Sequence, residues 1–430
     1  MTSTSTLVVR GVAVFDSEAG VVTPPQDVTV RDGLVARVVP AGTDDGVPRG
    51  TPTIDGTGRT LLPGLIDAHW HTSFATVPLL VALTADVGYV YAAAVVSARD
   101  TLLRGFTTVR DLGGPTFGLK RAIDEGVVPG PRIYPSGAFI SQTGGHGDFR
   151  LPYETPRGVV GHLSRGEIIG AAAIADGPAE VLRAAREQLM HGASQLKLMA
   201  GGGVASSYDP LDVSQYTFAE LRAAVEAAEN HGTYVTVHAY TPHAVRTAVE
   251  AGVRCIEHGQ LLDEPTIALL AERGVRLCLQ PFLDDDDAPP LSGPSRKKLE
   301  QMVAGTDTAY ALAIEHGVDV AFGTDVLFEP ALARRQGAML AKLTRWYTPA
   351  EVLQLATIRN AELLAMSGER NPYPGRLGVV AEGAIADLVL VDGDPVADLS
   401  LVERPDEAFV AIVKDGRLVK GEELVTPSAA

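Results

Sequence analysis

The sequence predicts an α/β protein in which a (β/α)₈ TIM barrel is inserted into a small β-sandwich built from both ends of the chain. Three observations predict this fold. The two ends carry matching β-rich runs, a helix–glycine–strand pattern recurs between them, and 430 residues are more than one small core needs. We therefore expect a terminal composite domain and a larger catalytic domain.

The two ends of the chain share a β-rich texture. Residues 7–15 and 27–39 are rich in β-branched side chains, and the second run contains Asp32-Gly33, a strong hairpin signal. Residues 386–391 and 409–419 repeat the texture near the C-terminus, again with an Asp-Gly pair. The simplest account is one β-sandwich domain made from residues 1–60 and 360–430.

Between the two ends, helical stretches, glycines and β-branched strands follow one another. Glycine just past a helix end is the usual left-handed cap, and helices that alternate with strands predict a parallel sheet. With the strands at residues 61–71 and 131–138, eight strands fit a metal-dependent barrel domain over residues 61–359. A doubly wound sheet is the alternative, but no Gly-rich dinucleotide fingerprint follows a first strand. The recurring glycines are Gly105, Gly192, Gly232, Gly252, Gly274 and Gly317.

Composition and charge limit the partners and the location. The net charge of −17, with no long Lys/Arg run, argues against nucleic acid and against an anionic membrane surface. No secretory signal is visible at the start, and no apolar stretch is long enough to span a bilayer. Cys255 and Cys278 lie in apolar runs, which favours two free thiols in a cytoplasmic protein over a disulfide.

The first barrel strand ends in two histidines. Residues i and i+2 of a strand point to the same side, so His69 and His71 project together while Trp70 faces away. Paired imidazoles at the end of a buried strand are suited to holding a divalent metal. Two histidines in one short motif can also arise by chance, so the other strands have to supply further ligands.

Four more strand ends carry side chains of this kind. In a barrel, chemistry is placed at the C-terminal ends of the strands. The fifth, sixth and eighth strands end in His238, His258 and Asp325, and the fourth holds Lys197 in an apolar run. A buried, unpaired ammonium is costly, so Lys197 requires a special reason. Together with the first pair, these residues form an ordered set that points to a metal centre.

Four aspartates in a row, Asp284–Asp287, interrupt the pattern after the seventh strand. They could form a site for a hard cation, but a solvated loop is the favoured interpretation because adjacent like charges repel. Loops after barrel strands surround the active site, so this loop could still shape substrate access.

On these motifs the chain resembles the binuclear-metal branch of the amidohydrolase superfamily. The resemblance rests on Pro63–His71, on the Lys-His-His-Asp order described above, and on Gly383–Val389. It implies two divalent metal ions bridged by an N6-carboxylated Lys197. Zinc is the default metal, and iron, manganese and cobalt stay open. By the same resemblance, one ion would be held by His69, His71 and Asp325, and the other by His238 and His258.

Two loop segments are similar to the prolidase-like dipeptidases and carboxypeptidases, a group that includes ochratoxin-hydrolysing amidases. They are Ser141–Asp148 and Lys197–Ser206. The resemblance implies that His146 and Tyr240 lie beside the substrate, whereas without it His146 is a loop histidine with a backbone partner. It also implies amide hydrolysis by a metal-bridging hydroxide, with Asp325 as general base and then acid, in a homo-oligomer.

The substrate we favour is a small molecule, a dipeptide or N-acyl amino acid with a free carboxylate. Hydrolysis of a cyclic amide, such as an imidazolone or hydantoin, is an alternative, as is hydrolysis of a urea, carbamate or thiocarbamate xenobiotic. Lys197 counts against a mononuclear deaminase, which uses no bridging lysine. An inactive structural paralogue would be expected to lack one or more ligands, and all six positions are filled.

Overall fold

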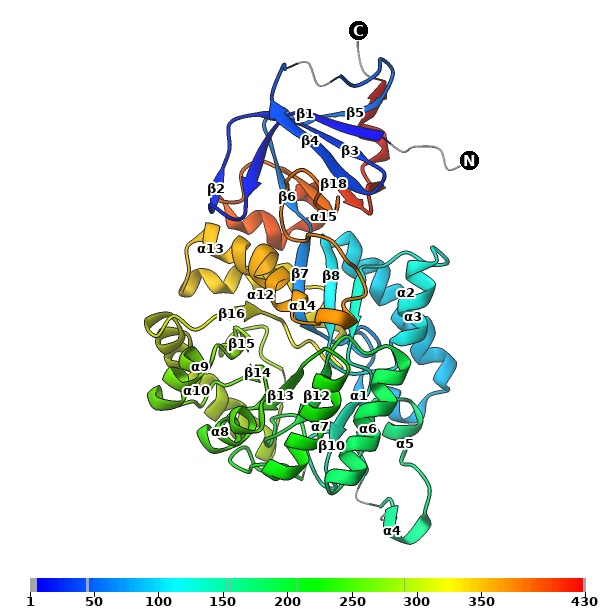
Figure 1. Ribbon diagram of the computed structural model, residues 1–430, viewed down its shortest axis with the longest axis vertical. Coiled ribbons are helices and arrows are strands. Elements are labelled where there is room, and N and C mark those ends of the chain that lie inside the picture. The colour runs from blue at the N-terminus through cyan, green and yellow to red at the C-terminus, as the bar shows by residue number, and fades with distance from the viewer. Residues whose placement is uncertain are drawn as a thin grey trace.

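The computed structural model describes residues 6–43, 46–151, 153–155, 157–206, 208–289 and 291–427. Two parts are stacked along the long axis of the molecule, a β-sandwich that carries both ends of the chain and a barrel surrounded by helices (Figure 1). The predicted fold class is therefore confirmed. The outermost residues of the predicted sandwich domain, 1–5 and 428–430, lie outside the described part of the chain.

The sandwich is built around one long strand that belongs to two sheets. β1 (Thr6–Asp16) pairs through its first half with β3 and β5 and through its second half with β6. Gly11 lies between the halves with φ +63°, a left-handed conformation that suits glycine and lets the strand bend. The other strands are β2 (Val21–Val22), β3 (Gln26–Arg31), β4 (Leu34–Pro40), β5 (Pro52–Asp55), β6 (Arg59–Pro63), β17 (Leu388–Asp392), β18 (Phe409–Lys414), β19 (Arg417–Lys420) and β20 (Val425–Pro427).

Both predicted Asp-Gly hairpins are present. Asp32 and Gly33 join β3 to β4 with φ values of 52° and 84°, and Asp415 and Gly416 join β18 to β19 with 53° and 69°. Two successive positive φ values define the turn whose twist matches that of the flanking strands, and Asp-Gly tolerates them. Strands from the two ends of the chain pair directly, since β17 lies antiparallel to β6.

The barrel has eight strand positions, as predicted. β9 and β10 share the third position, and β11 adds an edge strand beside β10. The ring closes where the Asp325 amide donates to the His69 carbonyl at 2.7 Å and the Ser194 amide donates to the Pro135 carbonyl at 2.7 Å. Gly64 joins β6 of the sandwich to β7 of the barrel. The strands are β7 (Leu65–Trp70), β8 (Phe106–Asp111), β9 (Arg132–Pro135), β10 (Phe139–Ser141), β11 (Ala172–Ile174), β12 (Leu196–Met199), β13 (Val235–Ala239), β14 (Cys255–His258), β15 (Arg276–Leu279) and β16 (Val320–Phe322).

Helices surround the barrel (Figure 1). Capping boxes begin α5, α7 and α13, and left-handed glycines follow α6, α8 and α9, as the glycine pattern predicts. No helix in the described ranges is long and apolar enough to cross a membrane. The helices are α1 (Leu79–Thr84), α2 (Val87–Leu103), α3 (Phe117–Asp124), α4 (Arg157–Val160), α5 (Arg165–Ile168), α6 (Pro178–His191), α7 (Phe218–Asn230), α8 (Pro242–Ala251), α9 (Glu264–Arg273), α10 (Gly293–Glu315), α11 (Pro330–Ala333), α12 (Gln336–Ala341), α13 (Pro349–Gln354), α14 (Asn360–Ala365) and α15 (Pro405–Ala408).

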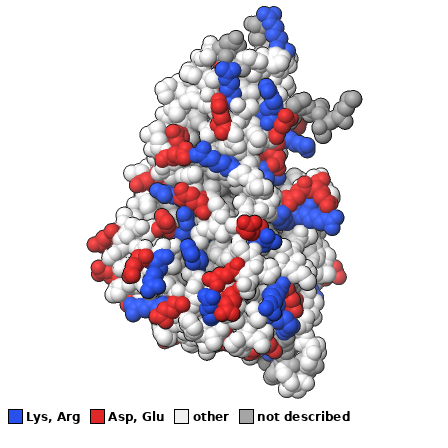
Figure 2. Space-filling view, in the orientation of Figure 1, with Lys and Arg blue, Asp and Glu red and all other residues white. Residues whose placement is uncertain are grey.

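Charged side chains of both signs are interspersed on the outer surface. Figure 2 shows Lys and Arg side chains next to Asp and Glu side chains over one face of the molecule. Many are ion pairs along one helix, such as Lys120–Asp124 and Arg296–Glu300, with N–O distances of 2.5 and 2.9 Å. Pairs of this kind add a few tenths of a kcal/mol each, so this surface contributes little to the fold.

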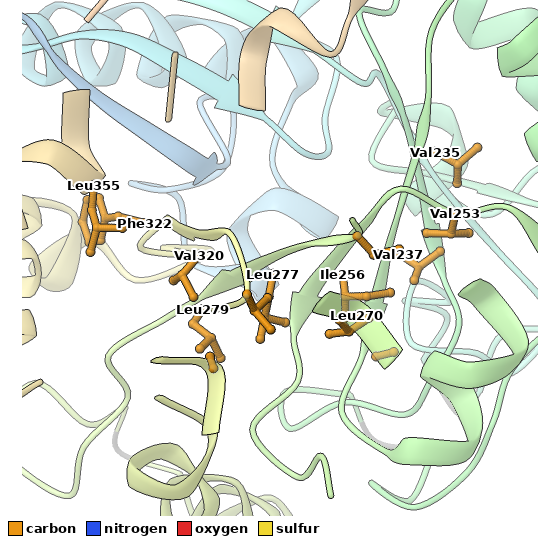
Figure 3. Packing of buried hydrophobic residues seen from close by; sticks show 14 of the residues in the cluster. Val235, Val237, Val253, Ile256, Leu270, Leu277, Leu279, Val320, Phe322 and Leu355 are labelled. Atoms are coloured by element: carbon orange, nitrogen blue, oxygen red, sulfur yellow. The ribbon is translucent and has the colours of Figure 1, made fainter. Parts of the chain in front are cut away.

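The main hydrophobic core lies between the barrel and its helices. Alternate strand residues point outward into it, among them Val235, Val237, Leu277 and Leu279 (Figure 3), and Leu270 of α9 packs against them. Since side chains alternate along a strand, the residues between them point into the barrel. This alternation assigns the apolar residues to the core and leaves Lys197, Thr236, His238, Glu257 and Gln280 on the inner face of the barrel.

The inner face contains a buried ion pair. The Arg110 guanidinium, on β8, lies 2.6 Å from Oε1 of Glu257, and both side chains are fully buried. Arg110 also donates to the Ala68 carbonyl at 2.6 Å and to the Tyr234 hydroxyl at 3.1 Å, while the Thr236 hydroxyl donates to Glu257. Although burial opposes the charge, Arg110 holds the pKa of Glu257 well below its usual range. Both side chains are therefore charged, and each also has other hydrogen-bond partners inside the barrel.

We expect Arg110→Met to lower the free energy of unfolding by about 3–5 kcal/mol, because it leaves the Glu257 charge buried without its partner. Calorimetry or denaturant unfolding measures the loss. Arg121→Met is the matched control, since Arg121 pairs with Glu125 on the exposed surface and its loss should leave the free energy of unfolding nearly unchanged. Equal effects of the two substitutions would contradict the prediction.

Candidate metal centre

Five of the six predicted ligands lie at or just beyond the C-terminal ends of barrel strands, whereas Lys197 is the second residue of β12. His69 lies in β7 and His71 directly follows it, while Lys197, His238 and His258 lie in β12, β13 and β14. Asp325 follows β16. Because parallel strands of a closed barrel end at one rim, residues distant in the sequence meet there.

The side chains converge on Asp325. Its Oδ1 atom lies 3.0 Å from Nε2 of His69 and 3.2 Å from Nε2 of His71, and its Oδ2 atom lies 3.9 Å from Nδ1 of His258. The ring of His238 is 4.4 Å from that of His258, centre to centre. Trp70 packs on the other side of the strand, among apolar residues, as the i, i+2 spacing predicts.

Two of these residues have an unusual backbone conformation. His258 has φ 81° and Asp325 has φ 53°, the left-handed region that side chains other than glycine rarely adopt. Such strain costs on the order of 1–3 kcal/mol per residue, and it concentrates at functional sites. In both cases it occurs where a strand ends and the side chain joins the cluster.

Each of the four imidazoles is held at one ring nitrogen by another part of the protein. Nδ1 of His71 lies 3.3 Å from the Gly113 carbonyl, and Nε2 of His238 lies 2.9 Å from the Gly202 carbonyl. Nδ1 of His258 lies 2.7 Å from Oε1 of Gln280. Nδ1 of His69 lies 2.9 Å from Oε2 of Glu257, though the hydrogen-bond angle there is poor. Metal-binding histidines are typically oriented in this way, which leaves the other nitrogen for the metal.

The electrostatics of the cluster also suit cations. Burial lowers the pKa of His238 well below its usual value and that of His258 to about 3, so both are neutral, as metal binding requires. Burial acts to lower the pKa of His69, but the nearby carboxylates of Asp325 and Glu257 act more strongly, so this pKa is raised. Against burial, His69 holds the pKa of Asp325 well below its usual range. The anionic Asp325 and the neutral His238 and His258 thus face one another at this end of the barrel.

Lys197 lies among these groups without a counter-ion. Its side chain is 2% exposed, and within the described ranges its amine makes no hydrogen bond or ion pair. Burial lowers the pKa of the amine, and Glu257 and Asp325 counteract this only in part. An amine in this setting favours the neutral form, or a chemical form that removes the positive charge.

His146 and Tyr240 lie beside the cluster. The His146 ring stacks on the His238 ring, with centres 4.2 Å apart, and the Tyr240 ring lies 5.0 Å from both His238 and His258. Burial raises the pKa of Tyr240 well above its usual value, so the phenol keeps its proton. Its hydroxyl has no hydrogen-bond partner among the residues the structure describes. It is available as a donor.

A cavity of about 170 Å³ opens above the cluster. All six predicted ligands, His146 and Tyr240 contribute to its lining. The rest of the wall is mainly apolar, with an aromatic side formed by Phe139, Phe149 and Phe328 and an aliphatic side that includes Leu299 and Met302. Such a cavity suits a ligand with an apolar group next to a polar reacting group.

The Asp284–Asp287 loop is bound to the protein by ion pairs. The Lys342 amine lies 2.7 Å from Asp285 and 2.8 Å from Asp287, and Arg335 also pairs with Asp287. Asp285 and Asp287 line the cavity. Asp284, Asp285 and Asp286 are exposed, as expected of a solvated loop, but Arg335 and Lys342, which flank α12, hold Asp285 and Asp287 in ion pairs.

Sequence reasoning missed the groups that hold the ligands. Glu257, Gln280 and Asp209 contact His69, His258 and His146. Glu257 directly precedes a predicted ligand in an apolar strand, and Gln280 stands where the seventh strand ends. The signal that could have identified both was a charged or amide side chain at a position that the strand pattern predicts to be buried. No local pattern marks Asp209.

Comparisons with known proteins agree with this geometry. A model of the amidohydrolase family matches residues 60–421. Ochratoxinase from Aspergillus niger is 34% identical over 337 residues, which make up 75% of this chain and 67% of that protein. The structure of a prolidase complexed with N-methylphosphonate-L-proline is 34% identical, with a TM-score of 0.87 over 96% of this chain and 99% of the other. A Xaa-Pro dipeptidase with methionine bound in its active site is 27% identical, with a TM-score of 0.81 over 97% and 100%.

Proposed function

Because this chain belongs to the amidohydrolase family, we propose that it is a metal-dependent hydrolase that cleaves the amide bond of dipeptides or N-acyl amino acids. The observation that carries the proposal is the convergence of four oriented imidazoles, Lys197 and Asp325 at the end of one cavity. The relatives that act on peptide-like bonds support the reaction class.

The donor set fits two divalent metal ions. His69, His71 and Asp325 would hold one ion, and His238 and His258 would hold the other, with Lys197 shared between them. Mixed nitrogen and oxygen donors favour zinc. When bound, two such ions polarise a carbonyl group and lower the pKa of water toward neutrality.

Lys197 would act as its carbamate. The neutral amine that burial favours can attack the carbon of CO₂, forming an N–C bond and releasing one proton to solvent. The product is an anion with two oxygen donors, which removes the cost of a buried ammonium and adds the negative charge that two cations require.

Asp325 would move the proton. Its side chain is 22% exposed, whereas those of His69 and His258 are 1% and 2% exposed, so it is the most accessible of the three. The Oδ2 atom, which accepts no hydrogen bond within the described ranges, can take a proton from the attacking water and give it to the leaving amine.

Tyr240 and His146 would act on the substrate itself. The protonated phenol of Tyr240 can donate to the oxygen of the scissile carbonyl or to the substrate carboxylate. His146 lines the same cavity and can contact the other side of the reacting group. The apolar walls would then receive the side chain of the amino acid that is released.

Metal removal tests the metal centre. Purified protein should contain about two equivalents of divalent metal, as a two-metal hydrolase requires. A chelator should remove both the metal and the activity, and added Zn²⁺ should restore the activity. Elemental analysis measures the content, and fewer than one equivalent, or full activity after removal, would contradict the proposal.

A substrate panel tests the specificity. N-acyl amino acids and dipeptides should be cleaved with a higher kcat/KM than aryl amides, lactams, ureas and carbamates. A higher kcat/KM for a lactam or a carbamate would replace the proposed substrate class with one of the alternatives. The cytoplasmic location and the homo-oligomeric state remain predictions from the sequence, and size-exclusion chromatography with light scattering tests the second.

A further inference from the structure

The His146 ring is fixed from three sides. It stacks on His238, and its Nδ1 atom lies 2.8 Å from the Ser206 hydroxyl and 3.5 Å from Oδ2 of Asp209. The His146 backbone amide donates to Gln215 at 2.9 Å. Since the Ser206 hydroxyl donates in turn to the Gly203 carbonyl, it receives the Nδ1 proton, and Nε2 is the nitrogen without a partner among the described residues.

Asp209 is the centre of the arrangement that holds this ring. Besides its contact with His146, its Oδ2 atom accepts from the Gly203 amide at 2.8 Å and from the Gln215 side chain at 3.2 Å. The residue is 3% exposed, and its second oxygen, Oδ1, has no hydrogen-bond partner in the part of the chain that the structure describes. Asp209 therefore links His146 to the loop after β12 and does not face solvent.

Gly203 leaves the space in which the ring lies. A Cβ atom at this position would be 1.9 Å from Cε1 of His146 and 2.0 Å from its Nδ1. No side chain fits at that distance, so the histidine packs directly on the glycine backbone.

Lys298, from α10 on the opposite side of the loop, holds the loop itself. Its amine donates to the carbonyls of Gly203 at 2.6 Å, Ser206 at 2.7 Å and Asp209 at 3.1 Å. These carbonyls belong to irregular backbone, whose polar groups need partners when they are buried. One lysine thus ties together the three residues that contact or flank the His146 ring.

We propose that Asp209 is a positioning residue that, with Ser206 and through the loop held by Lys298, fixes His146 so that Nε2 faces the reacting bond. The proposal rests on the hydrolase function proposed above. It differs from a purely structural role, because it requires Asp209 to act on the rate only through His146.

A double-mutant cycle tests this dependence. With the most active amide of the panel, Asp209→Ala should lower kcat by about 10- to 100-fold, as losing the partner of a functional histidine does, with little change in KM. In a His146→Ala background the same substitution should cause less than about a twofold further loss. Equal losses in both backgrounds would overturn the proposal. Asp209→Asn, which keeps the shape, should fall between wild type and Asp209→Ala.

Readouts that need no substrate separate this proposal from the proposed function. Crystal structures of the Asp209→Ala and Lys298→Met holoenzymes should show the His146 ring rotated away from its stack on His238. Nitrogen-15 spectra of the histidines should show loss of the Nδ1-protonated form of His146 alone. An unmoved ring with an unchanged spectrum would overturn the proposal even if amide hydrolysis were established, and the expected changes would support it even if the substrate class were wrong.

Matched controls lie close to these segments. Asp176→Asn, in the loop after β11, removes a carboxylate that accepts from Thr143 at 3.0 and 2.6 Å; Thr143 belongs to the loop that carries His146, but Asp176 does not touch the ring. Lys297→Met removes the exposed neighbour of Lys298. Both controls should keep kcat within about twofold of wild type, as surface changes away from a site usually do. A loss in the controls equal to that in Asp209→Ala would count against a specific role.

Discussion

Replacing Lys197 with alanine is expected to lower kcat/KM by about 10³-fold or more, since it removes a shared metal ligand and with it several kcal/mol of charge stabilisation. The metal content should fall from about two equivalents to one or less in the same protein, if this ligand is shared by both ions. In the metal-free protein the alanine removes a buried amine that has no ion-pair partner among the described residues, so the metal-free fold should not lose stability. Elemental analysis, steady-state kinetics and a melting curve on one preparation measure all three effects.

Chemical rescue makes the experiment specific. A short carboxylic acid such as acetate or propionate can occupy the space left by the side chain and supply the two oxygen atoms of the carbamate. Added acid should restore part of the activity of Lys197→Ala but not that of Asp325→Asn. Lys297→Ala, an exposed lysine on α10, serves as the control and should match wild type. Undiminished turnover in Lys197→Ala would show that Lys197 does not bridge metals.

The second large effect is expected for Asp325→Asn. The amide keeps an oxygen donor for the metal but cannot take up a proton, so kcat should fall by about 10²- to 10⁴-fold while KM changes little. Metal content must be measured beside the kinetics, because Asp325 also contacts His69 and His71. A loss of kcat with the metal retained would assign the proton transfer to this residue.

Asp285→Asn is the matched control for that substitution. Asp285 lines the same cavity, but it lies in an ion pair with Lys342 and away from the imidazoles. Its replacement should change KM more than kcat. If Asp325→Asn keeps full activity, or if Asp285→Asn loses as much kcat, the general base must be sought elsewhere.

Much of the fold can be predicted because its signals are local. The Asp-Gly turns require two left-handed residues, and such pairs form where these dipeptides occur. Glycine after a helix marks where a strand follows, and all six strands predicted in this way are present. The third strand was the exception, since residues 131–138 predicted one strand and the structure contains β9 and β10. Pro135 and Gly137 separate these two strands and interrupt the pairing.

The candidate ligands could be named for the same reason. Alternation along a strand places Lys197 and His238 inside the barrel, whereas His258 and Asp325 reach the common rim through left-handed backbone where their strands end. The structure brings all six together in one cavity. Their roles as ligands, and those of His146 and Tyr240 toward a substrate, remain predictions that metal analysis and the substitutions above can test.

The sequence by itself thus determined the barrel, the composite sandwich and the chemical types gathered at one rim, because each depends on residues close together in the chain. Only the tertiary structure decided which groups orient them. Gln280 reaches His258 from the end of a neighbouring strand, and Lys298 reaches the Asp209 loop from a helix that follows three strands later. Such contacts depend on how the ring closes and on side-chain geometry across it, which no local periodicity encodes. For that reason the candidate metal donors could be predicted from the sequence, whereas the network that holds His146 could not.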